Sequence, residues 1–400
     1  EVEVEEVVVT GSRIKRDSIN SSSVVTTITA EEIEQSQALI TADVLRLSTY
    51  NTFGSYPSTA GNSAMSNTTI SLRGLGGGRT LVLIDGRRLP GSPHLGGAGA
   101  ANINLIPTVS VDRIEILADG ASSVYGSDAI AGVMNFILKD NSEGVEFQVT
   151  QGTWLTAENG RGGEQDITAA ANIGLPLSDN GFLNISAEYS VRPELSRGYQ
   201  HASASDGYKG WVLGDDNTNA DGKYVGTQNV DDWQTAMNWG RPENNGFRSV
   251  WNAGLQVGDG VEAYSFGNYA DTYGEYSFFL RAAGKSGALT AIPLNPTDPS
   301  VGDFSWSDTY PTGFTPRLEG HGNDFSSVIG VKGDDLFGLG YDFSTSYGSN
   351  YKRYYLRNTL NASWGPNSPH NFEIGDLQQE ETNYNADFTY PMGDLNIGFG

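Results

Sequence analysis

The stretch SLRGLGGGRTLVLIDGRRLPG, Ser71 to Gly91, places a run of glycines and an arginine directly before a short apolar segment. Glycine-rich loops that precede a helix hold phosphates in nucleotide-binding proteins, so the first question is whether this loop does the same. A P-loop needs a Lys followed by Ser or Thr after its last glycine, and then a helix. Here the glycines end at Arg79, and the segment TLVLIDG that follows is β-prone and closes with a D-G turn. The stretch therefore predicts a compact turn that leads into a buried strand, and it disfavours a nucleotide site.

The composition excludes several classes of protein. With 400 residues, 51 glycines, 10% aromatic and 18% charged residues, the chain suits a large antiparallel β structure better than a helical enzyme. The net charge of −24 argues against nucleic-acid binding, which needs a basic surface. Cysteine is absent, so disulfides and thiolate metal sites are excluded. No apolar run approaches the ~20 residues of a transmembrane helix.

Catalytic residues are not predicted anywhere in the chain. The four histidines, His94, His201, His321 and His370, are scattered, and no two have the helical spacing of a metal-binding pair. The G-x-S-x-G motif of a nucleophilic serine is missing as well. We therefore expect a protein that is not an enzyme and that carries no resident cofactor.

The first 143 residues or so have a mixed α/β pattern. The segment TAEEIEQSQALITADVLRLS, which starts at Thr29, predicts two short helices, and Glu32 stands at the capping-box position relative to Thr29. Two short strands are predicted, one at residues 80–86 and one in VDRIEILADG at residues 111–120.

From Gly144 onward, apolar and polar residues alternate over many short segments, as expected for antiparallel strands with two different faces. In GVEFQVTQGTW, for example, Val145, Phe147 and Val149 share one face. Strands are predicted near residues 145–153, 166–175, 182–191, 249–257, 261–283, 324–332, 339–357 and 379–390, and a ninth begins at Leu395. We therefore expect eight complete strands and the start of another.

The connections between these strands alternate in length. Short turns rich in Asp, Asn and Gly are predicted at 178–181, 258–260, 333–338 and 391–394, and long polar segments at 193–247, 284–323 and 358–378. This alternation puts the short turns at one end of the sheet and the long loops at the other, which is typical of an outer-membrane barrel. A soluble β-sandwich or propeller is the alternative. We expect Trp154 and Trp251 at the long-loop ends of their strands, in an interfacial aromatic girdle.

Three blocks of the N-terminal region resemble the TonB-dependent outer-membrane transporters. EEVVVTGSR, which begins at Glu5, resembles the family's TonB box, although taken alone it fits an ordinary edge strand as well as a donated strand. TTISLRGLGGGRTLVLIDGRRLPG resembles the central motif of the plug domain, and INLIPTVSVDRIEILADGASSVYGSDAIAGVMNFILK is similar to the signature at its end. The blocks occur in the family's order and spacing, and they span nearly all of residues 5–139.

The resemblance implies a fold and a set of motif residues. A TonB box and flexible N-terminus (1–11) and a mixed α/β plug domain (12–143) are expected to precede an antiparallel transmembrane β-barrel (144–400). A family barrel has 22 strands, so the 400 residues are expected to be the N-terminal portion of a longer protein. The matching plug positions are Arg73, Gly74, Arg79, Asp85, Gly86, Arg113, Glu115, Tyr125, Gly126, Gly132 and Asn135, and the box is Glu5, Glu6, Val7, Val8, Val9 and Thr10.

One departure from the family concerns the contact between plug and barrel. Family members commonly carry an R-G-P triplet whose arginine helps tie the plug to the barrel, but this chain has Ala118, Asp119 and Gly120 there. We expect Arg73 or Arg113 to supply the missing positive charge, the alternative for each being a solvated surface arginine.

The resemblance also implies a function: uptake of a scarce nutrient across the outer membrane of a Gram-negative bacterium, driven by the periplasmic protein TonB. The partners expected are TonB with its inner-membrane energising complex, outer-membrane lipid and a small nutrient ligand. Tryptophans in the long polar loops suit stacking on sugar rings, which favours an oligosaccharide or other organic solute; a siderophore or cobalamin is the alternative. A surface β-rich binding protein without transport and a signalling receptor with a periplasmic domain upstream of the box are two competing hypotheses.

Two sets of loop residues are candidate sites. Five tryptophans are candidate ligand contacts: Trp211, Trp233, Trp239, Trp306 and Trp364. In NTNADGKYVGTQ, the residues Asn217, Asn219 and Asp221 have the spacing of the first ligands of a calcium loop. The usual acidic residues at its first and last positions are replaced by Asn217 and Gln228, so calcium binding is expected to be weak, and a plain Asx-rich loop is the alternative.

Overall fold

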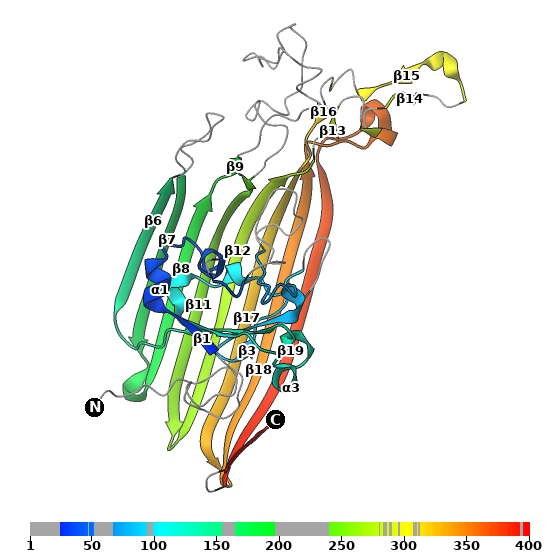
Figure 1. Cartoon of the computed structure of the whole chain (residues 1–400). Helices are drawn as coiled ribbons and strands as arrows, with labels where there is room; N and C mark the ends of the chain where they lie inside the picture. Colours follow the sequence, from blue (N-terminus) through cyan, green and yellow to red (C-terminus); the bar gives the residue numbers. More distant parts are fainter. Residues whose placement is uncertain are drawn as a thin grey trace.

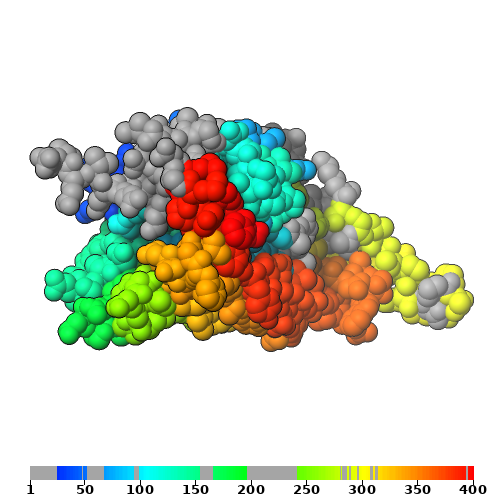
Figure 2. All heavy atoms as spheres, turned by 90° about the horizontal axis from the view of Figure 1, so that it is seen from below, coloured from blue at the N-terminus to red at the C-terminus, as the bar shows by residue number. Residues whose placement is uncertain are grey.

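The computed structural model describes residues 25–46, 48–51, 67–93, 99–153, 165–196, 240–279, 281–282, 286–287, 290–294, 297–306, 310, 313–392 and 395–400. Two parts stand out: a small α/β domain, and a tall antiparallel sheet that curves around it (Figure 1). Viewed from below, the green, orange and red strands form a wall, and the blue and teal residues of the small domain lie against its inner side (Figure 2). The mixed α/β region and the antiparallel sheet expected from the sequence are both confirmed.

The N-terminal domain is built on a five-stranded sheet with the order β1-β4-β5-β2-β3. Its strands are β1 (Val25–Thr29), β2 (Thr80–Ile84), β3 (Arg87–Arg88), β4 (Val111–Leu117) and β5 (Gly132–Leu138). Only the β2–β5 pair is parallel among the described pairs of this sheet. Three short helices, α1 (Ala30–Gln35), α2 (Thr41–Arg46) and α3 (Ser122–Tyr125), complete it, with 3-10 turns η2 (Gly77–Arg79), η3 (Ile103–Leu105), η4 (Thr108–Ser110) and η5 (Ser127–Ala129).

Local sequence signals explain the starts of two of these elements. Helix α1 begins after Thr29, whose side chain accepts a hydrogen bond from the Glu32 amide while the Glu32 carboxylate accepts one from the Thr29 amide, so the predicted capping box is confirmed. The glycine-rich stretch forms the predicted compact turn: Gly74 and Gly76 have φ of 71° and 95°, values that glycine adopts without strain. The turn leads into β2, in which every residue is buried.

The tall sheet, called the wall from here on, contains nine strands. Each pairs with the strand of this sheet that precedes it along the chain and with the one that follows it. They are β6 (Val145–Thr153), β7 (Gln165–Pro176), β8 (Gly181–Arg192), β11 (Glu243–Gly258), β12 (Val261–Ser277), β17 (Arg317–Leu336), β18 (Leu339–Arg357), β19 (Phe372–Met392) and β20 (Leu395–Phe399). Short pieces extend beyond its upper end: β9 (Leu195–Ser196), β10 (Gly240–Arg241), β13 (Arg281–Ala282), β14 (Ile292–Pro293), β15 (Asp303–Phe304), β16 (Gly313–Phe314), η9 (Pro299–Val301) and η11 (Ala362–Asn367) (Figure 1). The lower end carries tight turns, including η6 (Ser178–Asn180) and the pair Phe337 and Gly338. The nine predicted strands and the separation of short and long connections are confirmed.

Several predicted strand boundaries are wrong by up to seven residues. Strand β17 starts at Arg317 instead of 324, β19 starts at Phe372 instead of 379, and β12 ends at Ser277 instead of 283. The predicted turn at 333–338 is also too long, because β17 continues to Leu336. The residues of β17 and β19 that the sequence predicts as loop include many charged, polar and glycine residues, yet their backbones stay in the ladder: Arg317 pairs with Arg357, and Phe372 pairs with Leu356. A polar composition alone does not end a strand when neighbours satisfy its backbone hydrogen bonds.

The two faces of the tall sheet have an inverted polarity. On β7 the apolar residues Ile167 and Ile173 point outward and are 42% and 38% exposed, whereas Asp166, Thr168 and Asn172 lie buried beneath the N-terminal domain. Val145 and Phe147 on β6 are likewise exposed, at 75% and 72%. A water-soluble sandwich buries its apolar face, so this arrangement fits a sheet whose outer side contacts lipid. Among the described residues, no helix has the length and apolar character needed to span a membrane.

Trp251 lies in the middle of β11, so its expected position at the long-loop end of the strand is wrong. Its indole leans over Gly267 of β12 and stacks on Phe325 of β17, with ring centroids 6.1 Å apart. A Cβ on Gly267 would lie 2.4 Å from the indole, so the glycine creates the space for the ring. Trp154 lies outside the described residues.

The core of the N-terminal domain is largely its own. Ile114, Ile116, Met134 and Phe136 of β4 and β5 are fully buried in it, and the tall sheet adds Val250, Phe266 and Val328, with Tyr264 packed against them. Most of the described core residues therefore belong to the domain itself, and many of its side-chain contacts with the wall are hydrogen bonds and ion pairs.

Gly348 of β18 provides a test of how closely the two parts fit. A Cβ at this position would lie 2.1 Å from Cγ of Pro90 in the N-terminal domain, and a proline ring has no rotamer that moves it away. We expect Gly348→Ala to destabilise the seating of the domain by about 1–3 kcal/mol, measured as a lower midpoint of its unfolding in calorimetry. Gly78→Ala, where an added Cβ meets no atom within 4 Å, is the matched control, and an equal effect of the two changes would contradict this fit.

Candidate functional site: the polar interface between the N-terminal domain and the wall

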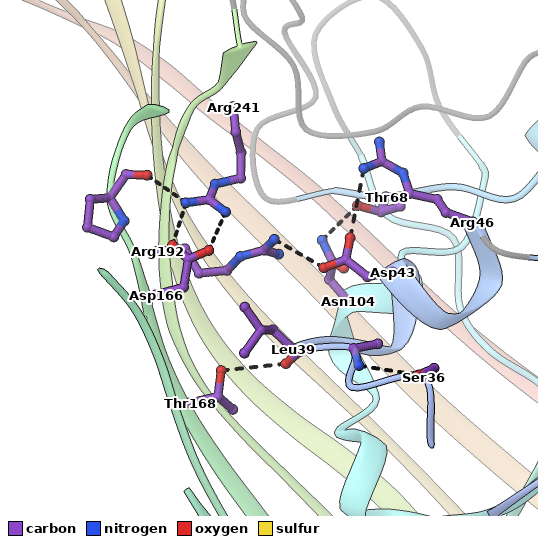
Figure 3. Close-up of polar contacts among 12 residues, drawn as sticks. Ser36, Leu39, Asp43, Arg46, Thr68, Asn104, Asp166, Thr168, Arg192 and Arg241 are labelled. Atoms are coloured by element: carbon purple, nitrogen blue, oxygen red, sulfur yellow. Dashed lines mark hydrogen bonds and ion pairs between the residues drawn. The ribbon is translucent and has the colours of Figure 1, made fainter. Parts of the chain in front are cut away.

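The upper part of the interface is an ion-pair network (Figure 3). Arg192 at the end of β8 donates from Nη2 to Asp43 of α2 over 3.1 Å. Beside it, Arg241 of β10 forms two hydrogen bonds with the carboxylate of Asp166 on β7, at 2.6 and 2.5 Å. Asp43 also lies 3.8 Å from Arg46 in the next turn of α2. Helix α2 is thus attached to the wall by a charged contact that involves a single carboxylate.

The middle of the interface is more deeply buried. Arg248 of β11 is 1% exposed, pairs with Glu188 at 3.3 Å, and donates to the carbonyl oxygen of Asn104 in the N-terminal domain. Lys352 of β18, also 1% exposed, donates to Oδ1 of Asn67 over 2.6 Å. Two cations of the wall therefore hold neutral oxygens of the N-terminal domain. Arg248 is compensated by the carboxylate of Glu188, and Lys352 interacts electrostatically with that of Asp324 on β17.

The lower part of the interface depends on Arg87, the first residue of β3. Its guanidinium forms ion pairs with Asp342 of β18 at 2.8 Å and with Asp387 of β19 at 2.9 Å, and it donates to the Tyr264 hydroxyl on β12 over 3.2 Å. The Arg87 side chain is 10% exposed, and its aspartates are about one-third exposed. One residue thus links the N-terminal domain to three strands of the wall.

The predicted tie through Arg73 or Arg113 is wrong. Arg73 donates to the carbonyl oxygens of Ile130 and Ala131, and Arg113 pairs with Asp112 and Glu115, so both act within the N-terminal domain. Arg113 lies on β4, which is flanked by strands on both sides, whereas Arg87 lies on β3 at the edge of the sheet. The available signal was that Arg87 directly follows the D-G turn, where a short edge strand presents its side chains to a neighbour.

The other predicted plug residues stabilise the N-terminal domain from within. Asp85 accepts a hydrogen bond from the Leu138 amide, the Gly86 amide donates to Asn135, and Arg79 donates to the Leu75 carbonyl. The carbonyl of Tyr125 accepts from Arg88, and Gly126 and Gly132 have φ of 87° and 132°. The described contacts of these residues are therefore structural, and a role in ligand or partner binding stays a prediction.

The tryptophans predicted to contact ligand differ in exposure. Trp306 is 5% exposed and packs with Phe304, Tyr310 and Phe314, so its expected exposure is wrong, because the connections above the sheet form a small apolar core of their own. Trp364 in η11 is 58% exposed. Strands β14 and β15 project well above the N-terminal domain and to one side of it (Figure 1).

Several candidate residues lie outside the described residues. These are the segment 5–10, Trp211, Trp233 and Trp239, and the calcium candidates Asn217, Asn219 and Asp221. Among the described residues, no group of three or more His, Asp or Glu is arranged to hold a metal ion. Calorimetric titration with calcium tests the loop at 217–228.

The neighbouring residues Arg87 and Arg88 allow a matched test of the interface. Arg87→Gln leaves Asp342 and Asp387 without their shared cation, and we expect it to destabilise the seated domain by about 2 kcal/mol. Arg88→Gln removes a more exposed pair with Asp128 and a bond to the Tyr125 carbonyl, both inside the domain, and the expected effect is about 0–1 kcal/mol. Limited proteolysis of the purified protein compares the two, and a faster cleavage of the Arg88 variant would contradict the assignment.

The carboxyl group of Asp85 should make the stability of the N-terminal domain depend on pH. Burial raises its pKa from 3.8 to about 7, with the Leu138 amide and Lys332 opposing this shift. Between pH 4 and pH 7 the folded domain therefore keeps a proton on Asp85 that the unfolded chain has lost. The contribution of this protonated carboxyl to the stability of the fold is fully present below pH 4 and is lost as the pH rises through 7. Asp85→Asn should be more stable than the wild type at pH 8, by roughly 1–2 kcal/mol because the side chain is partly exposed, and the gain should vanish near pH 4. Thermal unfolding at both pH values measures it, with Asp119→Asn at an exposed carboxylate as the control.

Comparisons with known proteins agree with this architecture. A family model described as the TonB-dependent receptor plug domain matches residues 17–133. The vitamin B12 transporter BtuB of Vibrio cholerae is 31% identical over 210 residues, which are 50% of this chain and 32% of the transporter. The iron-regulated outer membrane virulence protein of the same species is 29% identical over 200 residues, which are 49% of this chain and 29% of that protein. The chain thus spans about a third of the length of the curated relatives it matches.

Solved structures share the fold. A variant of the ferric enterobactin receptor PfeA of Pseudomonas aeruginosa superposes with a TM-score of 0.56 at 14% identity, covering 95% of this chain and 48% of the receptor. The siderophore receptor PirA of Acinetobacter baumannii gives a TM-score of 0.54 at 16% identity, covering 92% and 45%. By their names these relatives are transporters and receptors, not enzymes. The chain therefore carries the plug domain of the TonB-dependent receptors of the Gram-negative outer membrane, followed by nine strands that have the fold of part of a receptor β-barrel.

Proposed function

We propose that the protein is a TonB-dependent transporter that takes up a scarce solute across the outer membrane. The observation that supports this function best is the nature of the interface between plug and wall. The plug has its own apolar core and is attached to the wall mainly by ion pairs and hydrogen bonds, such as Arg87 with Asp342 and Asp43 with Arg192. Such contacts keep a domain seated at rest but exchange readily with water when the domain is pulled.

Energy for this movement comes in our proposal from TonB. The segment Glu5 to Thr10 adds as a strand to the sheet of TonB's periplasmic domain, and its backbone hydrogen bonds transmit a pulling force to the plug. In this scheme residues 1–11 are the attachment to TonB, residues 12–143 the plug, and residues 144–400 part of the barrel.

For the solute, we propose a cobalamin or a ferric siderophore. The sequence favoured an oligosaccharide because of its loop tryptophans, but Trp306 is buried in a loop core and is therefore not available for stacking. The relatives named above transport vitamin B12 or are receptors for ferric enterobactin and other siderophores, and none of those reported is named for a sugar. An oligosaccharide is thus the second choice.

Uptake by whole cells tests the transport function. A deletion strain that carries the gene on a plasmid is offered radiolabelled cyanocobalamin and ferric enterobactin, in the presence and absence of TonB. We expect TonB-dependent accumulation of one of the two. Surface binding that persists without TonB and is never followed by accumulation would favour the alternative of a binding protein, and growth on a panel of sole carbon sources tests the oligosaccharide.

The TonB box gives a prediction with a built-in control. Val8→Pro removes one backbone donor and bends the segment, so strand addition to TonB should fail, and we expect loss of uptake with solute binding unchanged. Val4→Pro lies just outside the box and should leave uptake close to that of the wild type. Uptake and equilibrium binding of the same labelled solute are measured side by side, and equal uptake by the two variants would refute this role of residues 5–10.

A further inference from the structure

The linker, residues 139–144, joins β5 of the plug to β6 of the barrel and lies against three strands of the wall. Asn252 of β11 donates to the Lys139 carbonyl over 3.2 Å, and Asn184 of β8 donates to Oδ1 of Asn141 over 2.7 Å. The amide of Gly174 on β7 donates to the Gly144 carbonyl over 2.9 Å. Two of these three bonds end on backbone carbonyls, so they fix the path of the chain itself.

The wall is shaped to receive this segment. A Cβ at Gly174 would lie 2.5 Å from the carbonyl oxygen of Asn141 and 2.7 Å from the Glu143 amide nitrogen, so only glycine allows this approach. Behind it, Asn172 donates to Asn184 over 2.5 Å and to Ser186 over 2.8 Å, which orients the Asn184 amide toward the linker. A row of neutral, hydrogen-bonded side chains thus supports the linker from β7 and β8.

The other attachments at the same end of the sheet are of a different kind. Arg87 reaches β18 and β19 through the tip of a long side chain, and its partners Asp342 and Asp387 are about one-third exposed. Asp342 lies close to the start of β18 and Asp387 close to the end of β19, next to the tight turns, as Gly174 and Asn184 do on β7 and β8. The linker contacts β7, β8 and β11, whereas Arg87 contacts β12 through Tyr264 and forms its ion pairs with β18 and β19. In the sheet order, the ion pairs of Arg87 thus lie beyond β12 and β17 from the strands that hold the linker.

We propose that the linker is a fixed anchor and that the plug is released from the opposite side, where Arg87 meets β18 and β19. When TonB pulls, the Arg87 ion pairs open and the plug swings away from β18 and β19, while residues 139–144 stay bound to β7, β8 and β11. The passage for the solute then forms along β18 and β19. This inference rests on the proposed transport function and adds the side on which the pore opens.

Paired cysteines test the two sides separately, and these 400 residues contain no cysteine of their own that could compete for the reagent. Asn141→Cys with Asn184→Cys bridges the anchor, and Arg87→Cys with Asp342→Cys bridges the release side. Each pair is joined in cells by a short bis-methanethiosulfonate reagent, which a reducing agent removes. Uptake of radiolabelled cyanocobalamin and ferric enterobactin is measured before bridging, after bridging and after reduction, with the single-cysteine variants as controls.

We expect bridging at the anchor to leave uptake unchanged, and bridging at Arg87 to abolish it until the bridge is reduced. Loss of uptake with the anchor bridged, or normal uptake with the Arg87 side bridged, overturns the inference. If the wild type accumulates neither probe under any condition, the two proposed solutes are wrong, and the anchor is then tested by hydrogen exchange of the purified full chain. The linker and the Gly174 amide should exchange as slowly as β7 and β8, and exchange as fast as that of the plug strands overturns the anchor.

Discussion

The whole arrangement depends on the inverted polarity of the barrel strands. A strand with lipid on one side must place its apolar residues outward, as Ile167 and Ile173 do on β7, and it is left with polar residues on the inner side. The plug therefore meets a wall of amides, carboxylates and guanidinium groups. Its attachment is made mainly from hydrogen bonds and ion pairs, and its stability comes mainly from a core of its own residues.

This division explains why residues of one motif have different roles. Asp85, Gly86 and Asn135 tie β2 to β5 and keep the plug intact, while Arg87, the next residue along the chain, faces outward and pairs with the wall. The sharp turn at Asp85 and Gly86 thus places contacts within the plug directly beside the contact of Arg87 with the wall. The plug can consequently part from the wall without losing the bonds that hold its own strands together.

The sequence identified what depends on local pattern. Alternation along 145–191 located β6 to β8 because the outward-facing residues are mostly apolar, and the capping box at Thr29 located α1. The remaining strand ends and side-chain contacts depend on residues that are close in space but distant in the sequence. Strand β17 continues through polar residues because β12 and β18 satisfy its backbone, Arg87 meets Asp387 across 300 residues of chain, and Trp306 is covered by Tyr310 and Phe314 from its own loop. None of these partners is visible in a local pattern of polarity.

The length of the central strands has a consequence for the outer surface of the cell. Strand β17 has 20 residues and so extends about 65 Å, whereas crossing the hydrocarbon layer takes only about half as many residues. The remainder stands above the lipid as a stiff collar, cross-linked by pairs such as Arg357 with Glu319 and Arg317 with Glu275. The upper part of the wall is thus held in shape by its own ion pairs, independently of the contacts that seat the plug beneath it.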